Sequence, residues 1–222
     1  MKKLAIISGA TYILAWIIGL VLASGGPEPD DPATEVASYF ARHEHAAMLG
    51  HLFVDGIAGL ALIGTAVVIS RFLRPRDPQM GKLGFLAALV AAATSLVQFG
   101  LGITFTYDAA HNGSPQTVRD LFVALNNTDT MKIVFLATMI ATVSVAARRS
   151  HVLPGWFAIY GFVTALLLAI SGFAFPFNNG VLLASLELTL LLLLIWVGIF
   201  SIQVARNVSG MPASEAAPVP AT

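Results

Sequence analysis

Residues 181–204 read VLLASLELTLLLLLIWVGIFSIQV, and this stretch indicates the class of protein. A membrane crossing needs roughly 20 mostly apolar residues in a helix, which the stretch supplies. Its one ionisable residue is Glu187. The helices of soluble proteins have a broad polar face, and this stretch has none. It therefore predicts a helix that spans a membrane.

Five further apolar stretches precede it along the chain. The six predicted spans are 4–23, 46–70, 83–106, 131–147, 155–175 and 181–204. Lys2 and Lys3 give the first stretch the basic start of a signal peptide. Its apolar part is longer than the roughly 7–15 residues of a signal peptide, so we expect a retained helix.

The composition excludes several other classes of protein. Of the 222 residues, 57% are hydrophobic and 11% are charged, whereas soluble domains average about 45–50% apolar and about 25% charged residues. The 12 Lys and Arg balance the 12 Asp and Glu, so the basic excess of a nucleic-acid partner is missing. We predict an all-α bundle of six transmembrane helices, with one domain over 1–207 and a disordered tail over 208–222.

Lys and Arg in the connecting segments predict the orientation. The side with both termini holds nine of them: Lys2, Lys3, Arg71, Arg74, Arg76, Lys82, Arg148, Arg149 and Arg206. The opposite side holds Arg42, Arg119 and Lys132. Because cytoplasmic loops are enriched in these residues, we expect a multi-pass protein of the plasma membrane with both termini in the cytoplasm.

The two longer outer connections carry start signals for helices. Asp31-Pro32 and Ser114-Pro115 each place a capping residue before a proline. Apolar residues then follow at helical spacing: Val36, Tyr39 and Phe40 in the first, and Val118, Leu121, Phe122 and Leu125 in the second. We predict two short amphipathic helices on the outer face, which either shield the loop backbone or cover a cavity as a lid.

Four polar residues inside the predicted spans form the candidate ligand site: His51, Asp55, Gln98 and Glu187. At about 1.5 Å per residue, Asp55, Gln98 and Glu187 lie roughly 13, 12 and 9 Å from the outer ends of their helices. Their common depth predicts an outward-facing cavity. Two alternatives remain open, because His51 and Asp55 at i, i+4 can pair for structural reasons, and Glu187 can form a buried structural bond.

A metal site is a separate hypothesis. His51 and Asp55 with His111 offer the imidazole and carboxylate ligands of a three-ligand zinc site, or a site for another divalent metal. The spacing permits this geometry without requiring it, so the default expectation is that no cofactor is bound. The chain has no Cys, which excludes thiolate zinc sites and iron–sulfur clusters.

Gly84, Ala88 and Ala92 form a stripe of small residues in the third predicted span. Small residues at every fourth position allow two helices to approach closely. The stripe predicts close packing within the chain or, alternatively, the seam of a homodimer.

Three segments resemble a family of bacterial six-helix integral membrane proteins of unknown function. They are Lys3–Leu14, Ser150–Trp156, and Glu187–Leu190 with Trp196. The resemblance extends over most of residues 1–207. It implies a six-helix membrane fold and adds weight to Glu187, but brings no activity with it. The His51 and Asp55 pair is not part of the resemblance.

We expect a non-enzymatic membrane protein that binds a small or lipophilic ligand in the cavity, with the lipid bilayer as its surroundings. The alternative is a membrane enzyme acting on a lipid or isoprenoid substrate, with Asp55 or Glu187 as acid–base and possible help from a metal. Ion- or proton-coupled transport is a third interpretation. The cytoplasmic halves of the spans offer no ionisable residue to continue a transport path, which counts against it.

Overall fold

The computed structural model describes residues 1–111, 113–173 and 180–209, and these contain helices joined by turns and short coils. Residues 208 and 209 of the predicted disordered tail are helical. The rest of the tail, from residue 210 onward, lies outside the described residues, as does the end of the fifth predicted span. The helical elements are α1 (Lys2–Ala23), α2 (Ala33–Arg42), α3 (Glu44–His51), η1 (Leu52–Ile57), α4 (Ala58–Leu73), α5 (Pro78–Ala110), α6 (Pro115–Ser150), α7 (Gly155–Ser171) and α9 (Gly180–Ser209).

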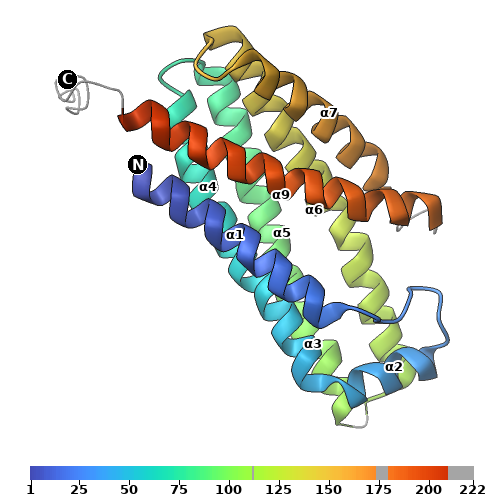
Figure 1. Cartoon of the computed structure of the whole chain (residues 1–222). Helices are drawn as coiled ribbons and strands as arrows, with labels where there is room; N and C mark the ends of the chain where they lie inside the picture. The colour runs from blue at the N-terminus through green and yellow to red at the C-terminus, as the bar shows by residue number, and fades with distance from the viewer. Residues whose placement is uncertain (112, 174–179, 210–222) are drawn as a thin grey trace.

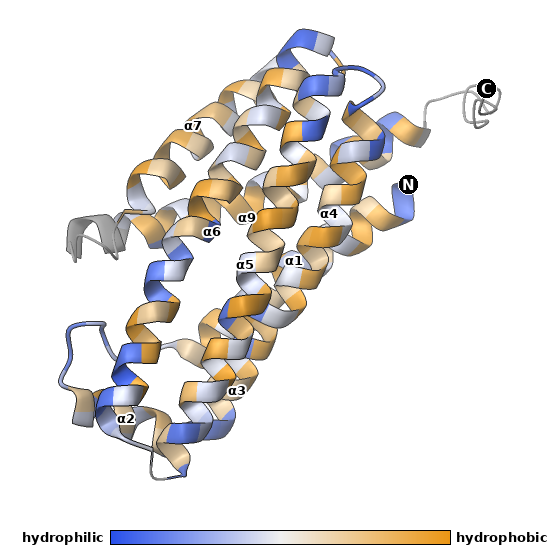
Figure 2. Ribbon diagram, turned by 180° about the vertical axis from the view of Figure 1, so that it is seen from behind, coloured by the Kyte–Doolittle hydropathy of each residue, from blue (hydrophilic) through white to orange (hydrophobic). Residues whose placement is uncertain are grey.

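The helices form an elongated bundle with two different ends (Figure 1). The start of α1 and the end of α9 lie at the same end as the short turns 74–77 and 151–154, which we call the termini end. At the opposite end, the α2 end, α2 lies beside the start of α3 and the connection between α5 and α6. Hydrophilic residues concentrate at the two ends and on the half of α6 nearer α2 (Figure 2).

Each of the six predicted apolar stretches forms a helix over most of its described residues. Five helical segments are long and apolar enough to cross a membrane, namely 2–23, 44–73, 78–110, 115–150 and 185–208. The sixth, α7, is also apolar but has 17 residues. The all-α fold is thus confirmed, while the count of six crossings stays a prediction.

The second segment contains a π-helical turn, η1, between α3 and α4. A π-turn inserts an extra residue into a helix, and such turns are frequent at functional sites. Asp55 lies in this turn and is 4% exposed. The turn therefore changes the face on which Asp55 lies relative to a regular helix.

The predicted separate helix after Ser114-Pro115 is wrong. Residues 115–150 form one continuous helix of 36 residues, α6, in place of an amphipathic helix followed by a short span. Beyond Pro115 this segment contains no Gly or Pro to interrupt it. The polar run Asn126–Asp129 is part of this helix: Asp129 accepts a hydrogen bond from Gln98 of α5, while Asn126 and Thr128 donate to carbonyls of α6 itself.

The first predicted amphipathic helix is confirmed as α2. Its Val36 and Phe40 are buried with Phe105 of α5 and Val118 of α6 in a small core at the α2 end. The ring of Phe40 lies 4.7 Å from that of Phe105 and 5.5 Å from that of Phe122. Whether α2 shields backbone or acts as a lid stays a prediction.

The stripe of small residues packs within the chain. Gly84, Ala88 and Ala92 are all buried. A Cβ atom at Gly84 would lie 2.9 Å from Thr142 Oγ1 of α6 and 3.2 Å from Ile69 Cγ2 of α4. The stripe thus packs against neighbouring helices of the same chain, and the homodimer seam stays a prediction.

Candidate functional site

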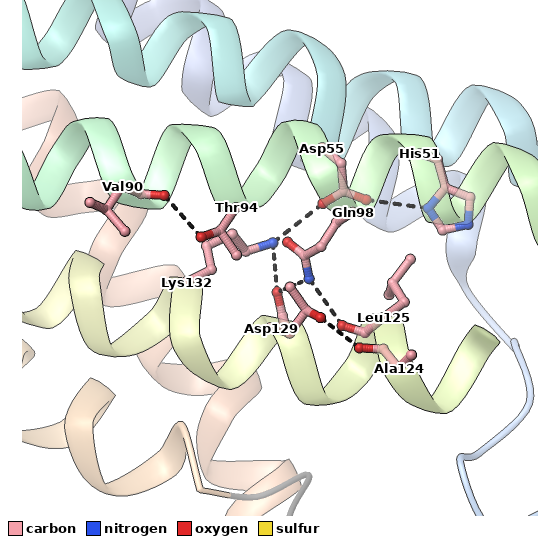
Figure 3. A network of polar contacts seen from close by, with 10 residues as sticks. His51, Asp55, Val90, Thr94, Gln98, Ala124, Leu125, Asp129 and Lys132 are labelled. Carbon is pink, nitrogen blue, oxygen red and sulfur yellow. Dashed lines mark hydrogen bonds and ion pairs between the residues drawn. The ribbon is translucent and has the colours of Figure 1, made fainter. Parts of the chain in front are cut away.

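Five polar side chains meet inside the bundle on the side of the α2 end (Figure 3). We call them the polar cluster, and they come from four elements: His51 from α3, Asp55 from η1, Gln98 from α5, and Asp129 and Lys132 from α6. Three of them, His51, Asp55 and Gln98, belong to the predicted ligand site. The sequence prediction did not include Asp129 and Lys132.

Lys132 is the centre of the polar cluster. Its Nζ atom lies 2.6 Å from Asp129 Oδ1 and 3.3 Å from Asp55 Oδ1, and its side chain is 3% exposed. A buried ammonium group has to be paired, because removing it from water without a partner costs several kcal/mol. Lys132 joins the two carboxylates and so links η1 to α6.

The predicted contact between His51 and Asp55 is present. His51 Nδ1 lies 3.3 Å from Asp55 Oδ2, which leaves Asp55 shared between the imidazole and the Lys132 ammonium group. The His51 side chain is 16% exposed and that of Asp55 is 5% exposed. A carboxylate next to one ring nitrogen favours the tautomer or charge state that donates from it.

Gln98 leaves an acceptor open in the polar cluster. Its Nε2 atom donates to Asp129 Oδ1 at 2.9 Å and to the Leu125 carbonyl at 3.2 Å. Both partners are acceptors, which fixes the orientation of the amide. Among the described residues, its Oε1 atom is buried without a hydrogen-bond partner, as is the hydroxyl of Tyr12 on α1.

Tyr12 and Trp16 of α1 form the wall beside Lys132. The Nζ atom lies 5.4 Å from the centre of the Trp16 ring, within the range of a cation–π interaction. Trp16 lies seven residues before the end of α1, which corresponds to about 10 Å along the helix. This depth agrees with the roughly 12–13 Å expected for Asp55 and Gln98.

A family model described as Domain of unknown function (DUF4386) matches residues 7–205. The chain belongs to the DUF4386 family. Comparison with curated proteins and with solved structures gave no match. The whole polar cluster lies inside the region matched by DUF4386, and so does Glu187. Because the family description states no activity, the function has to be argued from the geometry.

Glu187 does not join the other predicted residues in this DUF4386 chain. Its side chain is exposed on α9, whereas Leu186 and Thr189 are buried. The main neighbours of α9 are α1 and α7 rather than η1 or α5. The predicted four-residue cavity is therefore wrong for Glu187, because the helical period turns this position outward.

His111 also lies apart from the polar cluster. It stacks on Tyr107 at 4.0 Å between ring centres, and its Nδ1 lies 3.0 Å from the Tyr107 carbonyl. Gly102, which contacts the His51 ring, is nine residues away, or about 13 Å along the helix. Among the residues that the structure describes, no three His, Asp or Glu form a metal-binding group. The predicted set of His51, Asp55 and His111 is not assembled.

A hollow at the α2 end has a volume of about 310 Å³. It is lined by Pro29, Asp30, Arg119, Asp120, Val123, Asn126 and Asn127. None of these residues belongs to the predicted ligand site. The Arg119 side chain is directed to backbone, with Nε donating to the Asp31 carbonyl at 3.0 Å, so the hollow reflects the packing of the first outer connection on α6.

The spacing of Asp129 and Lys132 is the sequence signal that indicates their place in the polar cluster. The two residues are an i, i+3 pair, which places them on one face of a helix. That relation exists only if residues 126–132 are helical. Interpreting Asn126–Asp129 as an outer loop placed Lys132 at the membrane edge and separated it from Asp55.

Proposed function

We propose that the chain is a six-span integral membrane protein of the plasma membrane with both termini in the cytoplasm. The sixth crossing is α7, which can span with the turn that follows it. Nine Lys and Arg on the side of the termini, against three on the other, support this orientation. The start of α1 and the end of α9 lie at one end of the bundle, which fits an even number of crossings.

We further propose that this protein binds a small ligand inside the bundle, at the polar cluster. Ionisable side chains within membrane helices are costly and usually serve a function. The proposal rests above all on Gln98 Oε1, a buried acceptor that points into the polar cluster and has no hydrogen-bond partner in the part of the chain that the structure describes. A ligand with a hydrogen-bond donor would satisfy it, and the Tyr12 hydroxyl offers a second position.

The ligand would enter from the side of the α2 end. His51 and Asp129 are the most accessible members of the polar cluster, with side chains 16% and 17% exposed. Beyond His51 lies Phe105, whose ring meets the imidazole edge to face at 5.4 Å. The aromatic core under α2 therefore lies between the polar cluster and the α2 end.

Thermal unfolding of the purified protein in detergent tests this proposal. The panel comprises small amines, amides, polyols and short isoprenoid alcohols, with wild type compared with Gln98→Met and with Glu187→Gln as the matched control. A ligand at 100 times its Kd stabilises by about 2.7 kcal/mol. We expect one class to stabilise wild type and Glu187→Gln but not Gln98→Met. The proposal fails if every class shifts the three proteins equally.

Proton-coupled transport is the second candidate function. The observation in its favour is Lys132 between two carboxylates within the bundle, an arrangement that can gain or lose a proton when a substrate binds. The buried charged residues of the described chain are Asp55 and Lys132, so a path toward the termini end would have to use hydroxyl groups. Substrate-driven acidification in proteoliposomes, absent in Asp55→Asn, would support this candidate.

A further inference from the structure

We infer that the polar cluster takes up one hydrogen-bond-donating positive charge, either a proton or a small protonated amine. The inference rests on the proposed ligand site and names the chemical class of its ligand. With His51 neutral, two carboxylates face one ammonium group, so the polar cluster has a net charge of −1. One added positive charge would make it neutral.

The negative charge of the polar cluster follows from the ion pairs of its two carboxylates. The described residues that form ion pairs with Asp55 and Asp129 are His51 and Lys132 alone. Arg119, the next cation along α6 toward the α2 end, donates to the carbonyls of Pro29 and Asp31 instead. In a low-dielectric bundle an unbalanced charge is costly, and a cationic guest removes this cost.

The free polar atoms around the polar cluster are acceptors, which suit a ligand that donates hydrogen bonds. Gln98 Oε1 and the Tyr12 hydroxyl are both buried and have no hydrogen-bond partner within residues 1–111, 113–173 and 180–209, and each can accept a hydrogen bond. An ammonium group presents three or four N–H donors and would use such acceptors together with Asp129. A sodium ion has no donor, and it also needs several more oxygen ligands than the polar cluster has free.

A proton can provide the same charge through His51. A protonated imidazole beside Asp55 would bring the polar cluster to zero without any guest. Asp55 from η1 contacts His51 directly. The other titratable groups around the polar cluster are Tyr12 from α1 and Asp129 and Lys132 from α6, while α5 contributes the neutral Gln98. Protonation of His51 and binding of an amine should therefore compete.

Trp16 provides the readout, because its ring lies next to Lys132. The full chain in lipid nanodiscs is titrated with methylammonium chloride at pH 8 and pH 6, at constant ionic strength, against sodium chloride. Tryptophan fluorescence is recorded for wild type and for Trp16→Phe, so that the difference reports Trp16. Asp129→Asn makes the polar cluster neutral, and Glu187→Gln serves as the control that alters a carboxylate outside it.

We expect a saturable Trp16 signal with methylammonium at pH 8. Binding should be several times weaker at pH 6, because imidazoles gain a proton in this range. Asp129→Asn should lose the response, and Glu187→Gln should keep it. If Asp129→Asn does not fold, Gln98→Met provides the same comparison, with at least tenfold weaker binding. A Trp16 signal that follows pH but not methylammonium identifies the proton as the guest and also supports the inference.

Two results would overturn the inference that the polar cluster takes up a positive charge. One is a Trp16 signal that responds to neither pH nor methylammonium, and the other is an equal response to sodium. If a neutral compound then stabilised wild type but not Gln98→Met, the proposed ligand site would stand. Only the inference that its ligand is positively charged would be lost. The two proposals can thus fail separately.

Discussion

Two buried regions of the bundle differ in the side chains that hold their helices together. The polar cluster brings three charged groups and an imidazole together from α3, η1 and α6 (Figure 3). The region between α7 and α9 is instead held by an aromatic stack of Phe157, Trp196 and Phe200. Its ring centres lie 5.6 Å apart for Phe157 and Trp196 and 5.3 Å apart for Trp196 and Phe200.

The two regions differ in how much their side chains contribute to stability. A stack of buried rings is favourable as it stands, through burial and ring contacts. A buried ion cluster often contributes no more to stability than apolar residues of the same shape would. The aromatic stack also contains a buried polar atom, Trp196 Nε1, that has no hydrogen-bond partner among the described residues, but it contains no charged side chain. The charged groups of the polar cluster are what calls for a functional explanation. Substitutions in the two regions should accordingly differ in what they change.

Lys132→Met should have the largest effect. It leaves Asp55 and Asp129 facing each other without a cation, and loss of one partner from a buried ion pair costs about 3–5 kcal/mol. Chemical denaturation in detergent would measure this loss, with the exposed Lys82→Met as control. Adding Asp129→Asn should recover part of the lost stability. A loss below about 1 kcal/mol would show that the Lys132 contacts are not a buried network.

Phe40→Ala should come next, because it removes the ring that holds α2 on α5 and α6. Truncation of a buried Phe costs about 3 kcal/mol or more, and we expect the lower end because α2 can detach by itself. Modification of His51 by diethyl pyrocarbonate, followed by mass spectrometry, should become several times faster. The exposed Thr34→Ala is the control. An unchanged rate at His51 would mean that α2 does not limit access to the polar cluster.

Gly102→Ala and Gly161→Ala form a matched pair across the two regions. A Cβ at Gly102 would collide with the His51 ring, and one at Gly161 would collide with Ser144 Oγ and lie 2.9 Å from Trp196 Nε1. Each should cost about 2 kcal/mol through overpacking. Methylammonium titration should separate them, since Gly102→Ala alone displaces a member of the polar cluster. Equal weakening of binding by both would remove the distinction between the regions.

Tyr160→Phe should have the smallest effect. It deletes the hydrogen bond from the Tyr160 hydroxyl to the Leu192 carbonyl, 2.8 Å long, which ties α7 to α9. The expected loss is about 1 kcal/mol, without any change in methylammonium binding. Thermal unfolding and the Trp16 signal would be compared in the same sample. A binding defect here would indicate that the α7–α9 region is coupled to the polar cluster.

The sequence predicts the helices well because each apolar stretch is long and uninterrupted. It also predicts the His51 and Asp55 contact, since i, i+4 spacing is a local property of a helix. The π-helical turn at η1 was not predictable, because no residue in Leu52–Ile57 marks the inserted position. Local rules thus account for the fold and for one contact of the polar cluster.

The rest of the polar cluster depends on contacts between helices. Asn126–Asp129 is polar enough to resemble a loop, and the contact of its Asp129 with Gln98 on α5 is not visible in the sequence. The prediction that Glu187 belongs to the ligand site was wrong for the opposite reason. Leucines surround it in sequence on all sides, so hydropathy does not indicate which face of α9 is buried, and the carboxylate is in fact exposed.

A substitution series at Gln98 tests the central claim that the polar cluster has an unbalanced negative charge. Gln98→Lys, Gln98→Met and Gln98→Glu are compared by free energy of unfolding in detergent at pH 8. In an ordinary apolar interior, either charge is costly relative to Met. Our account predicts that Gln98→Lys is at least as stable as Gln98→Met, because a tethered ammonium replaces the guest, and that Gln98→Glu is the least stable. A Gln98→Lys protein destabilised as strongly as Gln98→Glu would contradict it.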